Sequence, residues 1–253
     1  MDLFRVALLV AAVVLLASAA RADDVAAFLA GQSRSCVKCA LVAAALKQKD
    51  LAGDDLTGAD LSRAVMHRAK LGGVKLDGAN LTDANLNKTD LKTASLVGAK
   101  AENAMFYGSD LSAADLSGAD LVNAKMQTAF LVRAKLDHAR ISEAMLNAVR
   151  LDDASLQGAD LSKTNLVEAS LRRANLEGVN LDNAGLVSAV LREANLKDAR
   201  LTEADLYGAD LSGADLTGAD LSGARLTGAI LTGATLTGAK LTGTLMPDGS
   251  VHE

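Results

Sequence analysis

The sequence has very few aromatic residues and almost no proline. Only 2% of its 253 residues are aromatic, none is Trp, and one is Pro. Aromatic rings normally give a globular core its bulk and give nucleic acids a stacking platform, so their scarcity disfavours both. Basic residues are outnumbered by acidic ones, 26 to 31, which also disfavours a nucleic-acid-binding protein. Because 50% of the residues are hydrophobic, we expect a folded chain with a core of small aliphatic side chains.

The first 22 residues have the pattern of a signal peptide. An apolar run of 12 residues, 6–17, follows Arg5, and the triplet Ala-Arg-Ala at 20–22 has the small-x-small form of a signal peptidase site. A retained membrane anchor is the alternative, but a helix needs about 20 apolar residues to span a bilayer. We therefore expect cleavage after Ala22 and a periplasmic or secreted mature chain without a stable membrane span. That chain has 24 basic and 30 acidic residues, a net charge of −6.

A period of five residues governs the rest of the chain. Of the 39 positions at every fifth residue from Leu51 to Leu241, 34 are Leu, and two residues before them 31 of 39 are Ala. Successive leucines at this spacing would spread around an α-helix and alternate between the two faces of a strand, so neither element explains the pattern. Each unit must bend the chain toward a shared axis, which is the property of a solenoid.

The five-residue units resemble those of a known family. Units such as A-D-L-Y-G at 204–208 and A-D-L-T-G at 214–218 are similar to the A-(D/N)-L-x-x motif of pentapeptide-repeat proteins, and the resemblance covers about residues 39 to 246. It implies an all-β solenoid, a right-handed quadrilateral β-helix with four units in each 20-residue coil and the Leu and Ala side chains inside. We expect four segments, which are a signal peptide at 1–22, an N-terminal cap at 23–40, the β-helix at 41–246 and a C-terminal tail at 247–253.

The two ends of the β-helix differ in sequence. Asp23 and Asp24 lead into an apolar stretch that ends at Gly31, the pattern of a short helix that would cap the first coil. A cap is needed because an open coil edge invites strand addition from another chain. At the other end, the turn sequence Pro-Asp-Gly at 247–249 should stop the coil and cover its last layer poorly.

The corners of the coil fall two residues after each central position. Gly occupies this site in eight successive units from Gly208 to Gly243, which suits a positive φ. In the middle of the chain the same site holds larger residues, among them Arg133, His138 and Glu143. We expect those corners to use a different turn that does not require Gly.

Cys36 and Cys39 form a C-x-x-C motif inside the expected cap. In an exported protein, two Cys this close favour a disulfide, which would pin the cap to the first coil. A zinc site is one alternative, but two thiolates are half of a tetrahedral site and no second such pair follows. Thiol redox chemistry is another, although the βαβ setting of a thioredoxin-like site is absent.

The remaining polar residues do not suggest catalysis. His67, His138 and His252 are scattered, and the many aspartates recur because the repeat places a polar outward residue before each Leu. With four units in a coil, these carboxylates point to four different sides, whereas acid–base catalysis needs converging groups in distinct environments. We expect no enzyme activity, no cofactor and no metal site.

Some outward positions carry apolar side chains, and these gather on two adjacent sides when the sequence is arranged in 20-residue coils. A contiguous apolar patch on a soluble protein usually marks an interface, so we consider these residues a candidate docking surface. Surface apolar residues scattered without function are the alternative. The candidate surface consists of Val65, Met105, Tyr107, Phe130, Met145, Val190, Tyr207 and Ile230.

These observations favour a non-enzymatic, exported, rigid rod that acts as a structural or protein–protein interaction module. Its partner is an unknown protein or a second copy of the chain, and no nucleic acid is expected. The resemblance alone supplies an alternative, since some pentapeptide-repeat proteins imitate DNA and bind type II topoisomerases such as gyrase. The signal peptide and the interspersed basic residues, for example Lys75 and Arg140, count against it. A thiol redox protein acting through Cys36 and Cys39 is the second alternative.

Overall fold

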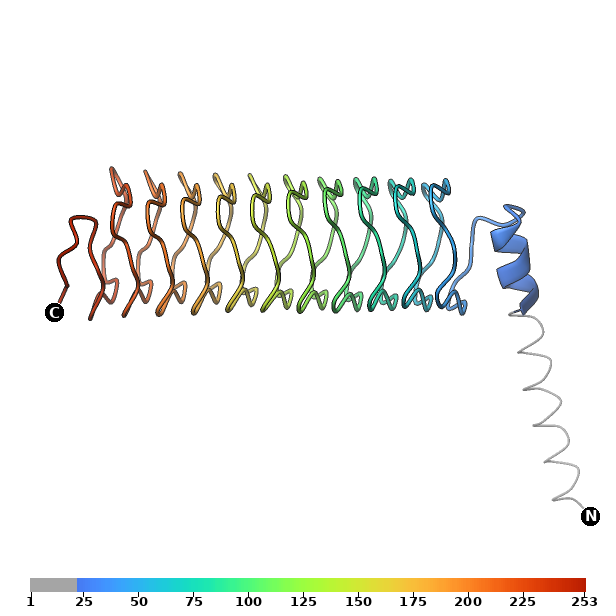
Figure 1. Cartoon of the computed structure of the whole chain (residues 1–253), viewed down its shortest axis with the longest axis horizontal. Helices are drawn as coiled ribbons and strands as arrows, with labels where there is room; N and C mark the ends of the chain where they lie inside the picture. The colour runs from blue at the N-terminus through green and yellow to red at the C-terminus, as the bar shows by residue number, and fades with distance from the viewer. Residues whose placement is uncertain (1–21) are drawn as a thin grey trace, which may run out of the picture.

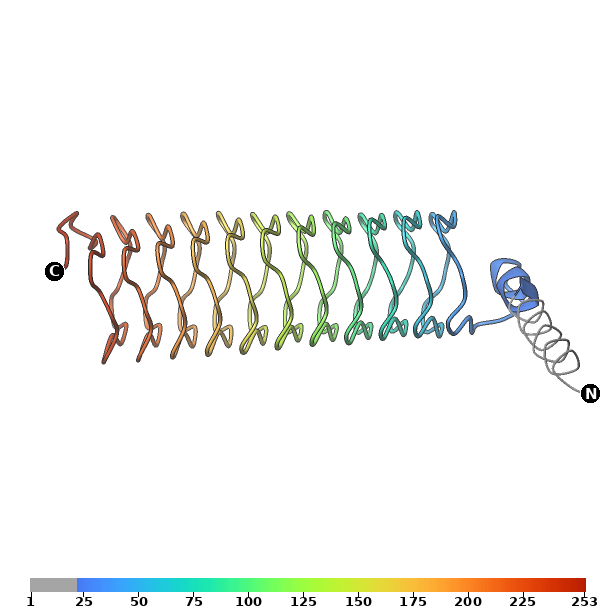
Figure 2. The same ribbon diagram turned by 90° about the horizontal axis from the view of Figure 1, so that it is seen from below.

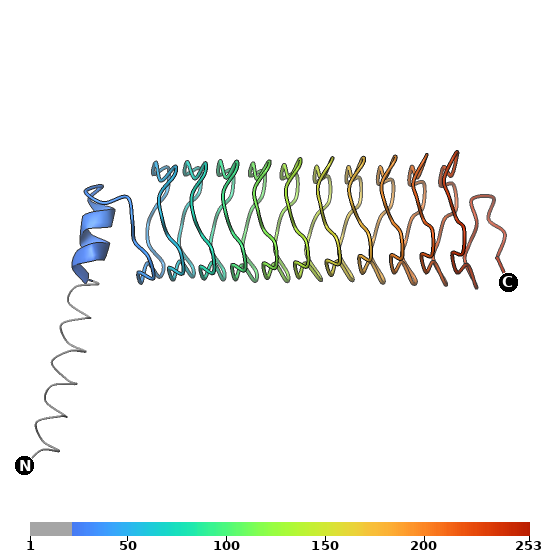
Figure 3. The ribbon, with the colours of Figure 1, turned by 180° about the vertical axis from the view of Figure 1, so that it is seen from behind.

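The computed structural model of the protein describes residues 22–253, so the predicted signal peptide lies outside the described residues except for Ala22. A helix spans residues 22–29, and from residue 35 the chain winds into a straight rod of stacked coils (Figure 1). The helix lies at one end of the rod and the C-terminus at the other, as two further views show (Figures 2 and 3). In the described part of the chain, no helix has the length and apolar character needed to cross a membrane.

Each coil contains 20 residues. Parallel bridges join residues 20 apart, from Ser35 and Asp55 at the N-terminal end to Arg225 and Leu245 at the C-terminal end. One residue of every five-residue unit takes part, so each coil has four sides and the bridging residues of one side form a column along the rod. We name each column after one of its first residues, and its members are the residues that lie at multiples of 20 from that residue. In chain order around the coil, the four columns are the Asp50, Asp55, Asp60 and Val65 columns.

Backbone hydrogen bonds hold each coil to both of its neighbours. The N–H of Leu56 donates to the carbonyl of Lys75 in the next coil at 2.8 Å, and the N–H of Lys75 donates back to Asp54 at 2.9 Å. The same two contacts recur on successive sides of the rod. Parallel pairing therefore extends along the whole rod although each side supplies only a single bridging residue.

The inward side chains form one continuous core. Every central side chain from Leu56 to Leu226 is at most 2% exposed, and the small residues two positions earlier share this interior. Burial of a Leu side chain contributes about 1.5 to 3 kcal/mol, so stacking of leucines between coils is the main stabilising interaction. The departures from Leu also face inward, including Ala101 and Phe106, which are both fully buried.

The corner turns are alike at Gly and non-Gly positions, so the expectation of a separate non-Gly turn was wrong. The φ angles of Arg133, His138 and Glu143 are 58°, 58° and 61°, close to the 64° to 72° of the glycines from Gly208 to Gly243. The N–H of His138 donates to a carbonyl of the next coil at 2.9 Å, as the corner glycines do. Because the neighbouring coil holds the backbone in place, side chains occupy a left-handed conformation that they seldom adopt alone.

The two ends of the core are covered unequally. At the N-terminal end, Phe28 of the helix is 4% exposed and belongs to the same buried cluster as the first leucines. At the C-terminal end the tail folds back over one side only, where Val251 pairs with Leu245 in an antiparallel bridge. The central residues of the last coil are therefore only partly buried; they are Leu231, Leu236, Leu241 and Met246.

Candidate functional site

The predicted docking residues lie on two neighbouring sides of the rod and on the corner between them. The Val65 column holds Val65, Met105 and Met145. The Asp50 column holds Phe130, Val190 and Ile230. The two-residue corner turn that joins these columns has Tyr107 or Tyr207 at its first position, directly after a central residue. The structure thus places all eight residues on adjoining surfaces.

These residues are exposed but do not form an unbroken apolar patch. Six of the eight are 40% to 48% exposed, the exceptions being Met105 and Val190, which are half-buried. In the Val65 column, Asn85 separates Val65 from Met105, and Lys125 separates Met105 from Met145. Apolar and polar side chains therefore alternate from coil to coil on this side.

Two of the exposed rings are covered by guanidinium groups. Arg150 lies over the ring of Phe130, 5.8 Å from its centroid, and Arg225 lies over Tyr207 at 5.0 Å. A cation above an aromatic face is attracted by the ring's negative charge density. Sequence analysis missed these contacts, although Arg150 follows Phe130 by 20 residues in the same column. The surface thus presents cations together with its aromatic rings.

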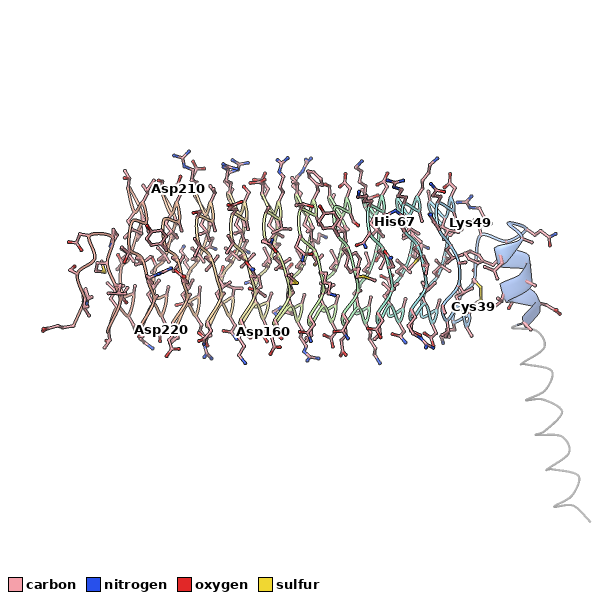
Figure 4. The ribbon with its side chains drawn as sticks, in the orientation of Figure 1. Cys39, Lys49, His67, Asp160, Asp210 and Asp220 are labelled. Atoms are coloured by element: carbon pink, nitrogen blue, oxygen red, sulfur yellow. A yellow bond between two sulfur atoms is a disulfide. The ribbon has the colours of Figure 1, made fainter. Side chains whose placement is uncertain are left out.

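The Asp or Asn before each central residue has a local structural role. The Oδ1 of Asp60 accepts a hydrogen bond from the N–H of Ser62 at 3.1 Å, and Asp210 and Asp220 make the same contact with the residue two positions on. This Asx turn satisfies a backbone donor at the corner. The Ser62 hydroxyl, which also donates to this carboxylate, holds the pKa of Asp60 below its ordinary value. These carboxylates are ionised structural groups, and Figure 4 shows Asp210 and Asp220 on opposite edges of the rod.

In some units that lack Asp or Asn at this position, the preceding coil supplies the acceptor. Met105 cannot form an Asx turn, and the N–H of Tyr107 donates instead to Oδ1 of Asn87 at 2.8 Å. The N–H of Gln157 likewise donates to Oδ1 of Asp137 at 2.9 Å. In these units a side chain of the neighbouring coil replaces the missing acceptor, which the sequence pattern alone did not reveal.

Many carboxylates are also paired with a cation one coil further on. Arg140 contacts Asp120 at 2.8 Å, and Lys240 contacts Asp220 at 3.1 Å. Exposed pairs of this kind contribute about 0 to 1 kcal/mol each. Their effect is to distribute both signs of charge along a side, so the Asp60 column is not a continuous acidic surface.

The two cysteines lie at disulfide distance and away from solvent. Their Sγ atoms are 2.06 Å apart, and Cys36 and Cys39 are 1% and 2% exposed. The bridges of Ser35 and Ala40 place the motif within the first coil, beside the helix (Figure 4). Thiol exchange needs an accessible sulfur, so this arrangement suits a structural link better than redox catalysis.

A buried carboxylate lies where the helix meets the first coils. Asp54 occupies an inward position at the edge of a small cavity lined by Phe28, Leu46 and Leu51, and it is 3% exposed. Burial raises the pKa of Asp54, and the ion pair with Arg34 at 2.7 Å opposes that effect. The Oδ1 atom has no well-directed hydrogen bond despite this ion pair. The pair joins the cap to the rod.

Nothing in residues 22–253 points to catalysis. The three histidines lie in separate units of the chain. Among the described residues, no three His, Cys, Asp or Glu side chains are grouped as a metal site would require. The candidate functional surface is therefore an outward face of the rod.

Comparisons with known proteins agree with this architecture. The family model for pentapeptide repeats matches eight copies between residues 39 and 246. The crystal structure of HetL, a pentapeptide-repeat protein involved in heterocyst differentiation regulation in Nostoc, is 36% identical, with a TM-score of 0.81 over 83% of this chain and 95% of that one. No match was found among the curated proteins.

Two further solved structures are less similar. QnrB1, a plasmid-mediated fluoroquinolone resistance protein, is 25% identical over 64% of this chain and 88% of its own, with a TM-score of 0.34. A pentapeptide-repeat protein of the Arabidopsis thaliana thylakoid lumen is 29% identical over 44% of this chain and 66% of its own, with a TM-score of 0.25.

The match to HetL and to the repeat model implies a right-handed β-helix for the stacked coils. It confirms the family predicted from the A-(D/N)-L-x-x units. The chain belongs to the family of pentapeptide-repeat proteins.

Proposed function

We propose that this chain is an exported, non-enzymatic rod that acts as a structural or protein–protein interaction module. One observation carries the proposal. The stacked core fixes the outward side chains in position, and Tyr107, Phe130 and Tyr207 are 40% to 47% exposed on adjoining surfaces. Exposed aromatic side chains held on a rigid scaffold are typical anchors of protein interfaces.

Export is supported by the sequence of the N-terminus and by the cysteines. The apolar run at 6–17 and the small-x-small triplet support cleavage after Ala22. A Cys36–Cys39 disulfide fits an oxidising compartment such as the periplasm or the exterior. Residues 23–29 of the helix would then begin the mature chain and cap the first coil through Phe28.

Cell fractionation with N-terminal sequencing tests the export step. We expect a periplasmic or secreted product that begins at Asp23 and that has no free thiol on titration without reductant. An intact chain in the cytoplasm, or two titratable thiols, would contradict this part of the proposal.

Photo-crosslinking in cells tests the interaction step. A photoreactive residue at Phe130 or Tyr107 should give a protein adduct, whereas one at Lys100, in the opposite Asp60 column, should not. Replacing Phe130 and Tyr107 with Asp should abolish partner capture or self-association. The interaction proposal fails if no position gives an adduct.

The two alternatives receive less support from the described residues. A DNA-mimicking protein that binds gyrase needs an acidic surface, but cations interrupt the Asp60 column in pairs such as Arg140 with Asp120. A thiol redox protein needs an accessible sulfur, but both cysteines are buried. An intact cytoplasmic chain in the fractionation experiment would favour the gyrase alternative.

A further inference from the structure

One surface of the rod has no carboxylates over much of its length. It consists of the Val65 column and the two-residue corner turn that follows this column. In the first coil these are residues 45, 47 and 48, and the surface includes the residues at multiples of 20 from them as far as residue 167. None of these 20 outward positions is Asp or Glu, although acidic residues outnumber basic ones in the chain. We call this surface the basic stripe.

The cations of the basic stripe are exposed and unpaired. Lys47, Arg68, Lys88 and Lys125 are all exposed. None of them takes part in the ion pairs found among residues 22–253. Cations in other columns do find carboxylates, as Lys70 does with Asp50 at 3.7 Å. The stripe therefore presents a row of positive charges with no counter-charge of its own.

The amides of the basic stripe add further donors. The Oδ1 atoms of Asn85, Asn87 and Asn165 accept backbone hydrogen bonds at 3.1, 2.8 and 3.1 Å, which leaves their NH₂ groups to bind elsewhere. In the Asp60 column the equivalent NH₂ of Asn80 donates to the carboxylate of Asp60 at 3.0 Å. The rod itself thus shows that a carboxylate can satisfy such an amide.

Acidic residues border the basic stripe on both sides without entering it. The corner before the Val65 column carries Asp83, Glu102 and Glu143, and the Asp50 column beyond the stripe carries Asp50, Asp90 and Asp110. Three of these six are already paired, namely Asp50 with Lys70, Asp110 with Lys92, and Glu143 with Lys163. The stripe is therefore a confined positive surface on an acidic protein.

These features select among possible occupants. A second copy of the same stripe would bring unpaired cations together, which is unfavourable. An anionic bilayer would need a more continuous apolar face, whereas Asn85 and Lys125 lie between Val65, Met105 and Met145. Met, Tyr and Arg are enriched at protein interfaces, and the uncompensated cations would complement a negatively charged partner.

We propose that the basic stripe binds an acidic segment of a partner protein, an inference that rests on the interaction function proposed above. Carboxylates of that segment would form ion pairs with the lysines and the arginine, as Asp50 does with Lys70. They would also accept hydrogen bonds from the amides, as Asp60 does from Asn80. Lys47 and Lys125 are four coils apart, about 19 Å at the usual strand spacing. An extended acidic segment of about six residues spans this length.

Binding of fluorescein-labelled poly-L-glutamate, followed by fluorescence anisotropy, tests the proposal. The variant K47Q/R68Q/K88Q/K125Q removes the four cations, and Gln is tolerated at the corner because Gln48 already occupies it with a φ of 58°. The control K70Q/K75Q/K135Q/K240Q changes the net charge equally but removes cations that are paired in other columns. Unchanged melting curves would show that both variants remain folded.

We expect the first variant to weaken the affinity for poly-L-glutamate by about tenfold or more and the control to change this affinity by less than about threefold. Added salt should abolish the binding. Equal loss in both variants, or no binding by the unaltered protein, would overturn the proposal. A third outcome would also overturn the proposal, in favour of a membrane surface. In that outcome phosphatidylglycerol vesicles bind the protein and lose binding in the first variant only, whereas poly-L-glutamate does not bind. If poly-L-glutamate does not bind but a photoreactive residue at position 107 still gives a protein adduct, only the acidic partner is rejected and the proposed interaction function is retained.

Discussion

At the scale of single residues, each position of the five-residue unit has its own physical task. The central Leu and the preceding Ala fill the interior, the Asp or Asn between them closes a corner turn, and the corner residue has a positive φ. Single substitutions can therefore test the role of each position separately. The inward position should control stability, and the outward positions should control recognition.

The first prediction concerns the inward position. Leu136 is 1% exposed, so Leu136→Ala should lower the free energy of unfolding by about 2 to 5 kcal/mol through lost burial and the cavity left behind. The adjacent outward change Lys135→Ala should alter it by less than about 0.5 kcal/mol. Urea unfolding followed by circular dichroism measures both. Similar effects of the two changes would contradict the assignment of inward and outward positions.

The second prediction concerns the corner. Gly118 has a φ of 65°, and an added side chain at this position would meet no atom within 4 Å, so any effect of substitution comes from the backbone. Gly118→Val should destabilise the rod by about 1 to 2 kcal/mol, because β-branched residues are strained at positive φ. Gly118→Asn should cost much less, since Asn tolerates this conformation and stands at the equivalent corner of Asn123. Equal losses of stability would show that the corner needs Gly for another reason.

At the scale of the repeating unit, the sequence predicts what faces inward but not how the corners close. The Leu period and the A-(D/N)-L-x-x units sufficed to identify the family. The left-handed turn at Arg133 was not predictable, because the hydrogen bonds that impose it come from a residue in the next coil. The role of Asn87 in satisfying Tyr107 was equally hidden, since these residues are neighbours only when the 20-residue coils are stacked.

The candidate docking surface and the basic stripe were also predictable from the sequence only in part. The column positions of Phe130 and Tyr107 followed from residue numbers once a 20-residue coil was assumed. The cations over the rings, and the unpaired state of Lys47 and Lys125, depend on side-chain geometry that the period does not contain.

The third prediction follows from the Asx turns. Hydroxyl donors such as Ser62 and Ser222 lower the pKa of Asp60 and Asp220 in the folded chain. A carboxyl group whose folded pKa lies below its unfolded value of about 3.9 stabilises the fold above that value and loses this contribution as the pH falls through the folded pKa. The free energy of unfolding should therefore be nearly constant from about pH 7 to 5 and fall below about pH 4.

The double variant D60N/D220N provides the control for this pH dependence. Asn can still accept the hydrogen bond of the turn, as Asn80 and Asn180 do in the same column. The variant should fold normally and lose less stability between pH 5 and 3 than the unaltered protein, because two titrating groups are gone. Stability that rises on acidification, or an identical loss in the variant, would refute the explanation.

At the scale of the whole molecule, the outward surfaces of the rod depend on the regular register of its coils. Each coil contacts only its neighbours, so outward residues 20 apart lie side by side although they are distant in sequence. The basic stripe, the ion-pair ladders and the exposed rings are all products of this register. A change of register would scatter them even if every unit kept its Leu.

The most direct test of this account is a set of distances between spin labels in the Asp60 column, measured by double electron–electron resonance. Labels at positions 60 and 140, 60 and 180, and 60 and 220 are separated by four, six and eight coils, or about 19, 29 and 38 Å at the usual strand spacing. We predict distances that increase in proportion to the number of coils. Distances that do not grow with sequence separation would contradict the stacked rod and every surface built on it.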